Sequence, residues 1–398
     1  MVKKLARVCP ICGNTEGEKL HHIQMIIPED MPIPSQYDVV SCRQCGFCFA
    51  DVEANQDDYN LYYKNSNDYS QTSDLKQFMT NTTDQSRLVL FEKYISKEAR
   101  IADMGCGSAS FLRCLKKAGY ENVFGIDPSI DSINHLKELG LDGAVGNLFD
   151  QAQEDLLGKF DVIVFTMVLE HIYDVEKVAP QLKQYVKEGG YIFIDVPASE
   201  GFSKYPTMIP NYFNREHINY FDKTSLDNLF LGHGCIRVNK DEESFVDVPL
   251  DEANSRFEMY LHGLFQVHGN SNRAIQKSKE GITSINSYFS YMNEKDAVMY
   301  SVLDQMFESN ESCIVWGTGS LIMYLLANYP GMTEKINYFV DNNTIKVGTS
   351  LQGKEIISPE YILKLDSSIP ILICSMYNAK DILKQIREMK IPNECYYW

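Results

Sequence analysis

The chain has 398 residues, 44% of them hydrophobic, which is enough to bury the cores of two or three domains. Its formal charge of −17 at pH 7 disfavours an extended nucleic-acid interface, which needs a basic surface, so we expect no nucleic-acid partner. No apolar run approaches the roughly 20 residues of a membrane span, and Cys9 and Pro10 stand where a signal peptide would have its apolar stretch. We therefore expect a cytoplasmic protein without a membrane partner.

Three stretches of different character follow one another along the chain. Residues 1–75 are rich in Cys, Pro and Tyr with little periodic pattern, and predict a small N-terminal zinc-binding module. Residues 76–250 alternate short apolar runs with amphipathic segments, which predicts a Rossmann-like α/β domain around a parallel sheet. Residues 251–398 begin with a helical pattern that contains no clear strand up to about residue 308. The alternation then restarts at Cys313, and predicts a smaller, C-terminal Rossmann-like α/β domain.

The first stretch contains two CxxC pairs, each followed by a glycine: Cys9 and Cys12, then Cys42 and Cys45. The odd total of eleven cysteines argues against a closed disulfide framework, and paired cysteines in a reducing compartment more often hold metal. Two such pairs complete a tetrahedral four-thiolate zinc site, which would be structural because no coordination position stays open. The alternative is four cysteines that only pack. The neighbouring His21 and His22 could replace a ligand, although surface or packing roles suit them better.

The segment 101–107, Ile-Ala-Asp-Met-Gly-Cys-Gly, predicts a strand, a tight turn and the start of a helix. Gly105 and Gly107 would let the backbone approach a ligand at the carboxyl end of the strand, where Asp103 can hold a cationic amine. A GxG also suits dinucleotide enzymes, but the third glycine of GxGxxG is missing. Asp127 ends the next apolar run, about twenty residues on, and can hydrogen-bond ribose hydroxyls.

Two later stretches complete this pattern, because residues 160–171 fit a fourth strand with its loop and residues 186–194 fit the turn into the following strand. Over roughly residues 82–200 the ordered set resembles class I S-adenosylmethionine-dependent methyltransferases. The resemblance implies S-adenosylmethionine as cofactor. It places Asp103, Gly105 and Gly107 around the methionine part, Asp127 on the ribose, Asn147 and Leu148 near the adenine, and Thr166 to Glu170 on the pocket floor. The alternative is a doubly wound domain that binds another nucleotide.

A segment that the minimal fold does not need, residues 212–221, follows the apolar run 191–196. In it Glu216 and His217 stand side by side, flanked by aromatic residues. A carboxylate or an imidazole can remove a proton, and aromatic rings can stack on a base or sugar. The residues alone suit either an acceptor site or an ordinary helix start with a solvated Glu-His pair.

The order of these parts resembles the zinc-containing sugar C-methyltransferases of deoxysugar biosynthesis, over nearly the whole chain. The resemblance implies a nucleotide-linked keto-sugar as the small-molecule substrate. A base removes the proton next to the ketone, and the enolate carbon then takes the methyl group. It further implies His217 as the base, Glu216 as a residue that orients it or contacts the sugar, and Tyr220 as a third catalytic residue.

The sequence also departs from that family. Asn214 stands where the family usually has tyrosine, and Arg215 follows it. A tyrosine is also expected from the segment that joins the zinc module to the core, where the candidates are Tyr62, Tyr63 and Tyr69. An O- or N-methyltransferase acting on a glycan or small metabolite is therefore the alternative. A third reading is a zinc-containing binding or scaffold protein with a vestigial cofactor site.

In the C-terminal unit the segment 316–320, Trp-Gly-Thr-Gly-Ser, follows a predicted strand and opens a predicted helix, and Asp341 ends the next strand. Taken alone this pattern suggests nucleotide binding. Ile322, however, occupies the third glycine position, which disfavours close helix–strand packing around a pyrophosphate. The unit resembles the C-terminal domain of the same methyltransferases, which implies that it closes the acceptor cleft and holds the nucleotide part of the substrate. A purely structural role is the alternative.

Overall fold

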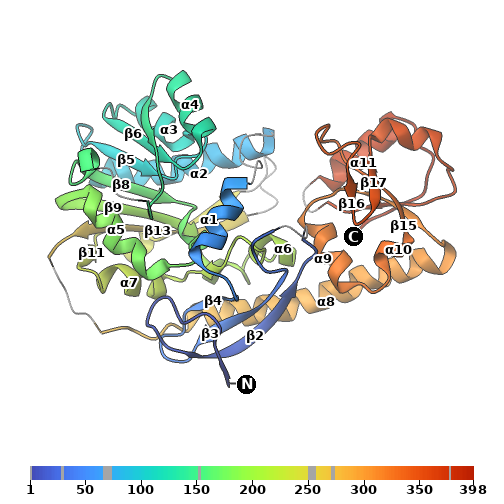
Figure 1. Ribbon diagram of the computed structural model, residues 1–398, viewed down its shortest axis with the longest axis horizontal. Coiled ribbons are helices and arrows are strands. Elements are labelled where there is room, and N and C mark those ends of the chain that lie inside the picture. The colour runs from blue at the N-terminus through green and yellow to red at the C-terminus, as the bar shows by residue number, and fades with distance from the viewer. Residues whose placement is uncertain are drawn as a thin grey trace.

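Three β-sheets and a long connecting helix organise the protein (Figure 1). The computed structural model describes residues 2–27, 31–65, 74–150, 154–249, 257–269, 274–375 and 378–398, without the side chains of residues 64–65 and 74–81. Within these residues the sheets are an N-terminal antiparallel sheet, a central mostly parallel sheet and a C-terminal mostly parallel sheet. The predicted α/β fold class, with its three parts, is confirmed.

The last strand of the N-terminal sheet comes from much later in the chain, after residue 200. In sheet order its strands are β1 (Val2–Lys4), β2 (Glu16–Gln24), β3 (Gln36–Cys42), β4 (Cys48–Asp51) and β10 (Asn219–Tyr220). The two residues of β10 pair antiparallel with Phe49 and Cys48 of β4. Since only Ile218 separates His217 from β10, this pairing ties the Glu-His segment to the N-terminal sheet.

The central sheet has the order β11-β13-β9-β8-β5-β6-β7, with β12 paired to β13. Its strands are β5 (Ile101–Met104), β6 (Val123–Asp127), β7 (Asp142–Val145), β8 (Phe160–Thr166), β9 (Val186–Pro197), β11 (Cys235–Arg237), β12 (Phe245–Pro249) and β13 (Phe257–Val267). The helices of this unit are α2 (Asp74–Tyr94), α3 (Ser110–Lys117), α4 (Ile130–Glu138), α5 (Val178–Tyr185) and α7 (Lys223–Leu231). In the sheet β5 lies between β6 and β8. The chain adds β6 on one side of β5 and later returns to add β8 on the other side. The carboxyl end of β5 is therefore the switch point at which such sheets bind ligands.

The helical pattern expected between residues 251 and 308 is wrong for Phe257–Val267, which forms β13 and pairs antiparallel with β9. Most of this strand is buried, so it lacks the apolar–polar alternation that identifies a half-exposed strand in a sequence. The central sheet thus extends past residue 250. The expected helix does form further on, as α8 (Glu280–Ser309).

The C-terminal unit is the smaller α/β fold that the alternation predicts. In sheet order its strands are β16 (Ser350–Leu351), β17 (Lys354–Ile357), β15 (Ile336–Val340), β14 (Cys313–Trp316), β18 (Ile371–Ile373) and β19 (Cys395–Tyr396). Its helices are α9 (Ser320–Asn328), α10 (Met332–Lys335) and α11 (Ala379–Glu388). All pairings in this sheet are parallel except that of β16 with β17.

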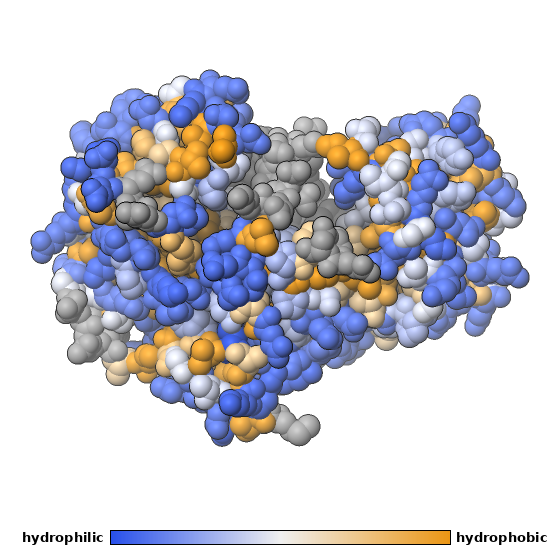
Figure 2. All heavy atoms as spheres, in the orientation of Figure 1, coloured by the Kyte–Doolittle hydropathy of each residue, from blue (hydrophilic) through white to orange (hydrophobic). Residues whose placement is uncertain are grey.

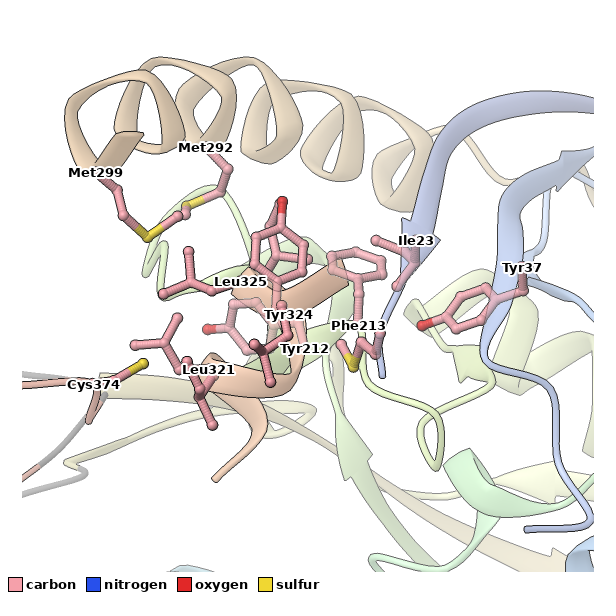
Figure 3. Packing of buried hydrophobic residues seen from close by; sticks show 14 of the residues in the cluster. Ile23, Tyr37, Tyr212, Phe213, Met292, Met299, Leu321, Tyr324, Leu325 and Cys374 are labelled. Carbon is pink, nitrogen blue, oxygen red and sulfur yellow. The ribbon is translucent and has the colours of Figure 1, made fainter. Parts of the chain in front are cut away.

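One hydrophobic cluster joins the N-terminal sheet, the Glu-His segment, α8 and the C-terminal unit. Figure 3 shows Met292 and Met299 of α8 facing Leu321 and Leu325 of α9, with Phe213 close by. Each fully buried side chain of this size contributes roughly 1.5–3 kcal/mol. The cluster therefore holds the segment after α6 (Ile209–Tyr212) against both neighbouring units.

The face of the molecule drawn in Figure 2 is mostly polar. On the face shown in Figure 2, hydrophilic residues predominate and hydrophobic ones occur in small groups. No helix within the described ranges is both long and apolar enough to cross a membrane.

Candidate functional site

The loop after β5 makes the tight turn that the sequence predicts. Gly105 and Gly107 have φ values of +86° and +48°, a region that side-chain-bearing residues rarely adopt. A Cβ on Gly105 would also lie 2.8 Å from Cγ2 of Val168, in the loop after β8. The turn therefore brings the loops after β5 and β8 into contact, and only glycine fits at position 105.

Asp127, at the end of β6, accepts a hydrogen bond from the backbone of this turn. Its Oδ2 accepts the backbone N–H of Gly107 at 2.8 Å, and its Oδ1 accepts that of Ser129 at 2.9 Å. A carboxylate has about four acceptor positions, so this one can still accept ribose hydroxyls. The structure thus places Asp127 beside the glycine loop, as a ribose-binding acid requires.

Within the part of the chain that the structure describes, two buried carboxyl groups at this edge of the sheet have oxygens without a hydrogen-bond partner. Asp103, 3% exposed at the end of β5, has none at Oδ1, and Glu170, 1% exposed in the turn Leu169–His171, has none at either oxygen. Burial raises the pKa of Asp103 to about 7 and the pKa of Glu170 to about 8. Unpaired buried carboxylates are costly, so such groups suit a cationic ligand. The ammonium and sulfonium of S-adenosylmethionine are cations of that kind, and the residues present fit this cofactor.

A buried ion-pair network beneath the glycine loop was missed by sequence reasoning. Arg87 of α2 contacts Asp84 at 2.8 Å and Asp195 of β9 at 2.6 Å, and Ser110 at the start of α3 donates to Asp84. The Arg87 guanidinium is thus paired with the carboxylates of Asp84 and Asp195. It anchors α2 to the sheet.

The predicted adenine region borders a cavity of about 270 Å³ at the ends of β6 and β7. Asn147 lines it, together with Ile126 and Tyr185, whereas Leu148 is buried beside it in the chain. The Asn147 Oδ1 accepts the N–H groups of the residues two and three positions further on, so this side chain also shapes the loop. Thr166 is buried at the end of β8.

The Glu-His segment meets two tyrosines of α1 (Gln56–Asn65) and a histidine that the sequence reasoning did not select. The Tyr62 hydroxyl donates to Oε1 of Glu216, and the Tyr63 hydroxyl lies 2.8 Å from Nδ1 of His171. The rings of His171 and His217 meet edge to face with centroids 4.8 Å apart. We call these five residues the acceptor cluster. Tyr69, the third tyrosine candidate, lies outside the described residues.

The acceptor cluster borders the cofactor residues through Glu170. One ligand atom each of Glu170, His171 and His217 lies within 4.8 Å of the others. The His171 Nδ1 lies 3.2 Å from the Glu216 backbone carbonyl, and its Nε2 lies 3.7 Å from Oε1 of Glu170. The only sequence signal for His171 was its position directly after Glu170.

Both imidazoles of the acceptor cluster are neutral at physiological pH. Burial lowers the pKa of His217 to about 3, with His171 lowering it further and the Glu216 carboxylate opposing them. Burial also lowers the pKa of His171 to about 4. A neutral imidazole can accept a proton, which is what a general base requires.

Asn214 folds the turn that presents the Glu-His pair. Its Oδ1 accepts the backbone N–H groups of Glu216 and His217 at 2.8 and 2.7 Å, and its own carbonyl accepts the Tyr37 hydroxyl at 2.7 Å. Tyr220, predicted as a catalytic residue, is buried in β10, where its hydroxyl donates to that of Tyr37. The structure gives Tyr220 a supporting place in the core, and a catalytic role for it stays a prediction.

Arg7 links the first CxxC pair to the acceptor cluster. This side chain is 2% exposed and donates to the backbone carbonyls of Ile172, Tyr173 and Ile218. These segments directly follow His171 and His217. The N-terminal module therefore helps to position both histidines, which no local sequence pattern indicated.

The four cysteines of the two CxxC pairs lie together. The Cys9 and Cys45 sulfurs are 3.5 Å apart, as are those of Cys12 and Cys42, and all four lie within 4.8 Å of one another. Tetrahedral zinc with bonds of about 2.3 Å separates its sulfurs by about 3.8 Å, so the cluster suits zinc. The two neighbouring histidines have other contacts: His21 stacks on Phe289, and His22 bonds Asp38.

Replacing Cys42 by serine is expected to release the metal and to lower the free energy of unfolding by about 4 kcal/mol or more, because loss of a metal site is among the largest single-residue effects. Elemental analysis of the purified protein and thermal unfolding measure both effects. Cys395→Ser, a half-buried cysteine in β19, is the matched control and should keep one zinc per chain. Wild-type protein that purifies without zinc from zinc-containing medium would contradict the assignment.

Comparison with known proteins agrees with this geometry. Residues 75–236 match a family model described as a methyltransferase domain, and residues 309–395 match one described as C2185-like, N-terminal. Ubiquinone biosynthesis O-methyltransferases of Methylococcus capsulatus and Colwellia psychrerythraea are 33% and 35% identical over 113 and 101 residues. Those matches cover 27% and 24% of this chain and 47% and 41% of the relatives, so the chain spans less than half of their length. The chain thus contains a class I S-adenosylmethionine-dependent methyltransferase domain.

Solved structures show a weaker likeness. An S-adenosylmethionine-dependent methyltransferase from Mesorhizobium loti has a TM-score of 0.36 at 13% identity, covering 46% of this chain and 97% of that one. The PH0226 protein from Pyrococcus horikoshii has a TM-score of 0.38 at 17% identity, covering 52% of this chain and 98% of that one. Likeness at this level carries no conclusion about substrate.

Proposed function

We propose that this protein, whose residues 75–236 match a methyltransferase domain, methylates a carbon atom of a nucleotide-linked keto-sugar after a base has removed the neighbouring proton. One observation carries the proposal. Two neutral imidazoles, His171 and His217, lie beside Glu170 at the edge of the cofactor residues. A proton acceptor thus stands next to the groups that would hold a methyl donor, as base-assisted transfer requires.

The cofactor residues have separate tasks in this proposal. Asp103 receives the ammonium of S-adenosylmethionine at its unpaired oxygen, and Asp127 accepts the ribose hydroxyls. The bound cofactor supplies a methyl group activated by its cationic sulfur. The four-cysteine cluster holds zinc in a closed structural site and takes no part in the chemistry. Arg7, next to the first cysteine pair, connects it to the segments that carry the acceptor cluster.

The acceptor cluster performs the proton transfer. A ring nitrogen of His217 accepts the proton from the carbon next to the ketone, and the adjacent Glu216 carboxylate favours the imidazolium that forms. Tyr62 fixes Glu216 by its hydrogen bond, and Asn214 fixes the backbone of both residues. The tyrosine rings at this edge offer apolar surface to a sugar.

Oxygen methylation is the second candidate. The curated relatives that match the domain at 33–35% identity are named as O-methyltransferases, and the same imidazole would accept a proton from a hydroxyl group. The two candidates differ in whether a carbon-bound proton is removed.

A solvent-exchange experiment separates them. A panel of nucleotide-linked keto-sugars is first screened for thermal stabilisation in the presence of S-adenosylhomocysteine, because a ligand that binds the folded state raises its melting temperature. The stabilising compound is then incubated in D2O with the protein and S-adenosylhomocysteine, and followed by NMR. Carbon methylation predicts that the proton next to the ketone exchanges although no methyl group is available. A compound that shows no such exchange, yet is methylated once S-adenosylmethionine is supplied, would favour the oxygen acceptor.

A further inference from the structure

The proposed function gives Asp103 to the cofactor ammonium and leaves the buried carboxyl group of Glu170 without a partner. This side chain is 1% exposed, and neither of its oxygens has a hydrogen-bond partner among the described residues. Burial of a carboxylate is costly unless a cation or a hydrogen-bond donor meets it. The groups that face Glu170 indicate which kind of cation it receives.

Two imidazoles lie beside this carboxyl group. Nε2 of His171 is 3.7 Å from Oε1 of Glu170, and one ligand atom each of Glu170, His171 and His217 lies within 4.8 Å of the others. A direct hydrogen bond would bring nitrogen and oxygen to about 2.7–3.2 Å. Tetrahedral ligands about 2.1 Å from a metal ion lie about 3.4 Å apart, which is closer to the observed 3.7 Å. The three side chains thus surround a point that a metal ion can occupy after small rotamer adjustments.

Other contacts already orient the two rings. Nδ1 of His171 lies 2.8 Å from the Tyr63 hydroxyl and 3.2 Å from the Glu216 carbonyl oxygen, while its Nε2 lies near Glu170. Metal-binding histidines commonly have such a polar partner at the second ring nitrogen, because it fixes the ring. The ring of His217 is held by its edge-to-face contact with that of His171. Little rearrangement is therefore needed for both to bind one ion.

The kinds of ligand atom select a class of metal ion. Mg²⁺ and Ca²⁺ prefer oxygen ligands, whereas two imidazoles and one carboxylate suit Zn²⁺, Co²⁺ or Fe²⁺. Three protein ligands leave a coordination position open, unlike the four thiolates of the cysteine cluster. Both histidines are half-buried, so water or a small ligand can reach that position.

We propose that Glu170, His171 and His217 form a second metal site, which binds a divalent transition-metal ion such as Zn²⁺ when no acceptor is bound. With three ligands and no thiolate, this site holds its ion less tightly than the cysteine cluster does, so the ion leaves on dialysis. The bound ion occupies the ring nitrogen of His217 that would take the proton, so it inhibits methyl transfer reversibly. Binding does not depend on the acceptor, whereas the inhibition rests on the proposed function.

Titration of the full chain with Co²⁺, followed by its absorption, tests the site without any acceptor. The protein is used as purified and dialysed, with zinc in the cysteine cluster. We expect one Co²⁺ per chain with the visible bands of a nitrogen–oxygen site, and no near-ultraviolet thiolate band of the kind that exchange into the cysteine cluster would give. Glu170→Gln and His171→Ala are each expected to weaken Co²⁺ binding at least about tenfold, because even loss of a contact that only supports a ligand costs that much.

His135→Ala is the matched control. His135 and Glu138 form an exposed histidine–carboxylate pair on α4, with Nδ1 and Oε2 3.9 Å apart, and no third ligand joins them among the described residues. This variant should bind Co²⁺ as the wild type does. Cooperative thermal unfolding of each variant checks that it is folded.

The proposal is overturned if the wild type shows no visible cobalt bands at millimolar Co²⁺, or if the thiolate band accounts for all of the bound cobalt. It is equally overturned if folded Glu170→Gln and His171→Ala bind Co²⁺ as the wild type does. None of these outcomes contradicts the proposed methylation, and absence of methylation would not affect the binding result. In the methylation assay, Zn²⁺ that fills the site should stop turnover and a chelator should restore it. Undiminished turnover with the site filled would overturn the inhibitory role.

Discussion

Replacing His217 by alanine is expected to lower the rate of methyl transfer by about 100- to 10,000-fold, the usual contribution of a positioned general base. The cofactor residues are untouched, so S-adenosylhomocysteine should bind with wild-type affinity. Burial lowers the pKa of His217 to about 3, so the neutral, proton-accepting form persists across the acidic range. The rate should therefore not show the decline near pH 6.5 that an unperturbed histidine base would cause. Steady-state kinetics between pH 5 and 8, with calorimetry for the cofactor, measure each part.

His135→Ala is the control for the loss of a histidine, since His135 lies exposed on α4, away from the acceptor cluster. It should keep the wild-type rate. A His217→Ala protein that turns over at the wild-type rate would show that another group takes the proton, and His171 would be the next candidate.

Replacing Asp103 by asparagine is expected to weaken S-adenosylhomocysteine binding about 100-fold or more, and to stabilise the cofactor-free protein by about 1–3 kcal/mol. The two effects have one cause. The buried carboxyl has a folded-state pKa raised to about 7 from 3.8, so the folded protein holds a proton that the unfolded chain releases. Its contribution to stability therefore falls as the pH rises from about 4 to about 7 and stays unfavourable above that. Asparagine removes this penalty and also removes the negative charge that the cofactor ammonium needs.

The same titration makes cofactor affinity depend on pH. Wild-type affinity for S-adenosylhomocysteine should rise between pH 6 and 8, as Asp103, whose pKa burial raises to about 7, loses its proton. Asp142→Asn, at an exposed position of β7, is the control and should change neither affinity nor melting temperature. An affinity that stays flat over this pH range and is unchanged in Asp103→Asn would remove Asp103 from the cofactor site.

The parts of the site that could be predicted from the sequence are those with local signals. The loop 101–107 and Asp127 lie on consecutive strands of one βαβ unit, so their spacing alone brings them together. The CxxC pairs likewise carry their own turn glycines, and a metal needs only that two such turns meet. The restart of the alternation at Cys313 predicted the C-terminal unit for the same reason.

The acceptor cluster could not be predicted in full, because it depends on contacts between distant segments. His171 and His217 meet because two residues, Asn219 and Tyr220, join the N-terminal sheet, and a strand of that length has no sequence period. In the sequence Arg7 looks like an ordinary surface charge. In the structure its guanidinium is buried against segments that lie 165 to 212 residues further along the chain. Asn214, noted only as a departure from the related family, proves to shape the turn of the Glu-His pair.

The central claim is that the protein moves a methyl group from S-adenosylmethionine to carbon with the acceptor cluster as base. Incubation of the wild-type chain with methyl-¹³C-labelled S-adenosylmethionine and the keto-sugar found by thermal screening tests it most directly. Carbon NMR of the product should show the label as a methyl group bonded to the carbon next to the ketone, in place of the proton removed, and His217→Ala should transfer the label at least about 100-fold more slowly. A label found on oxygen or nitrogen, or equal transfer by wild type and His217→Ala, would contradict the account.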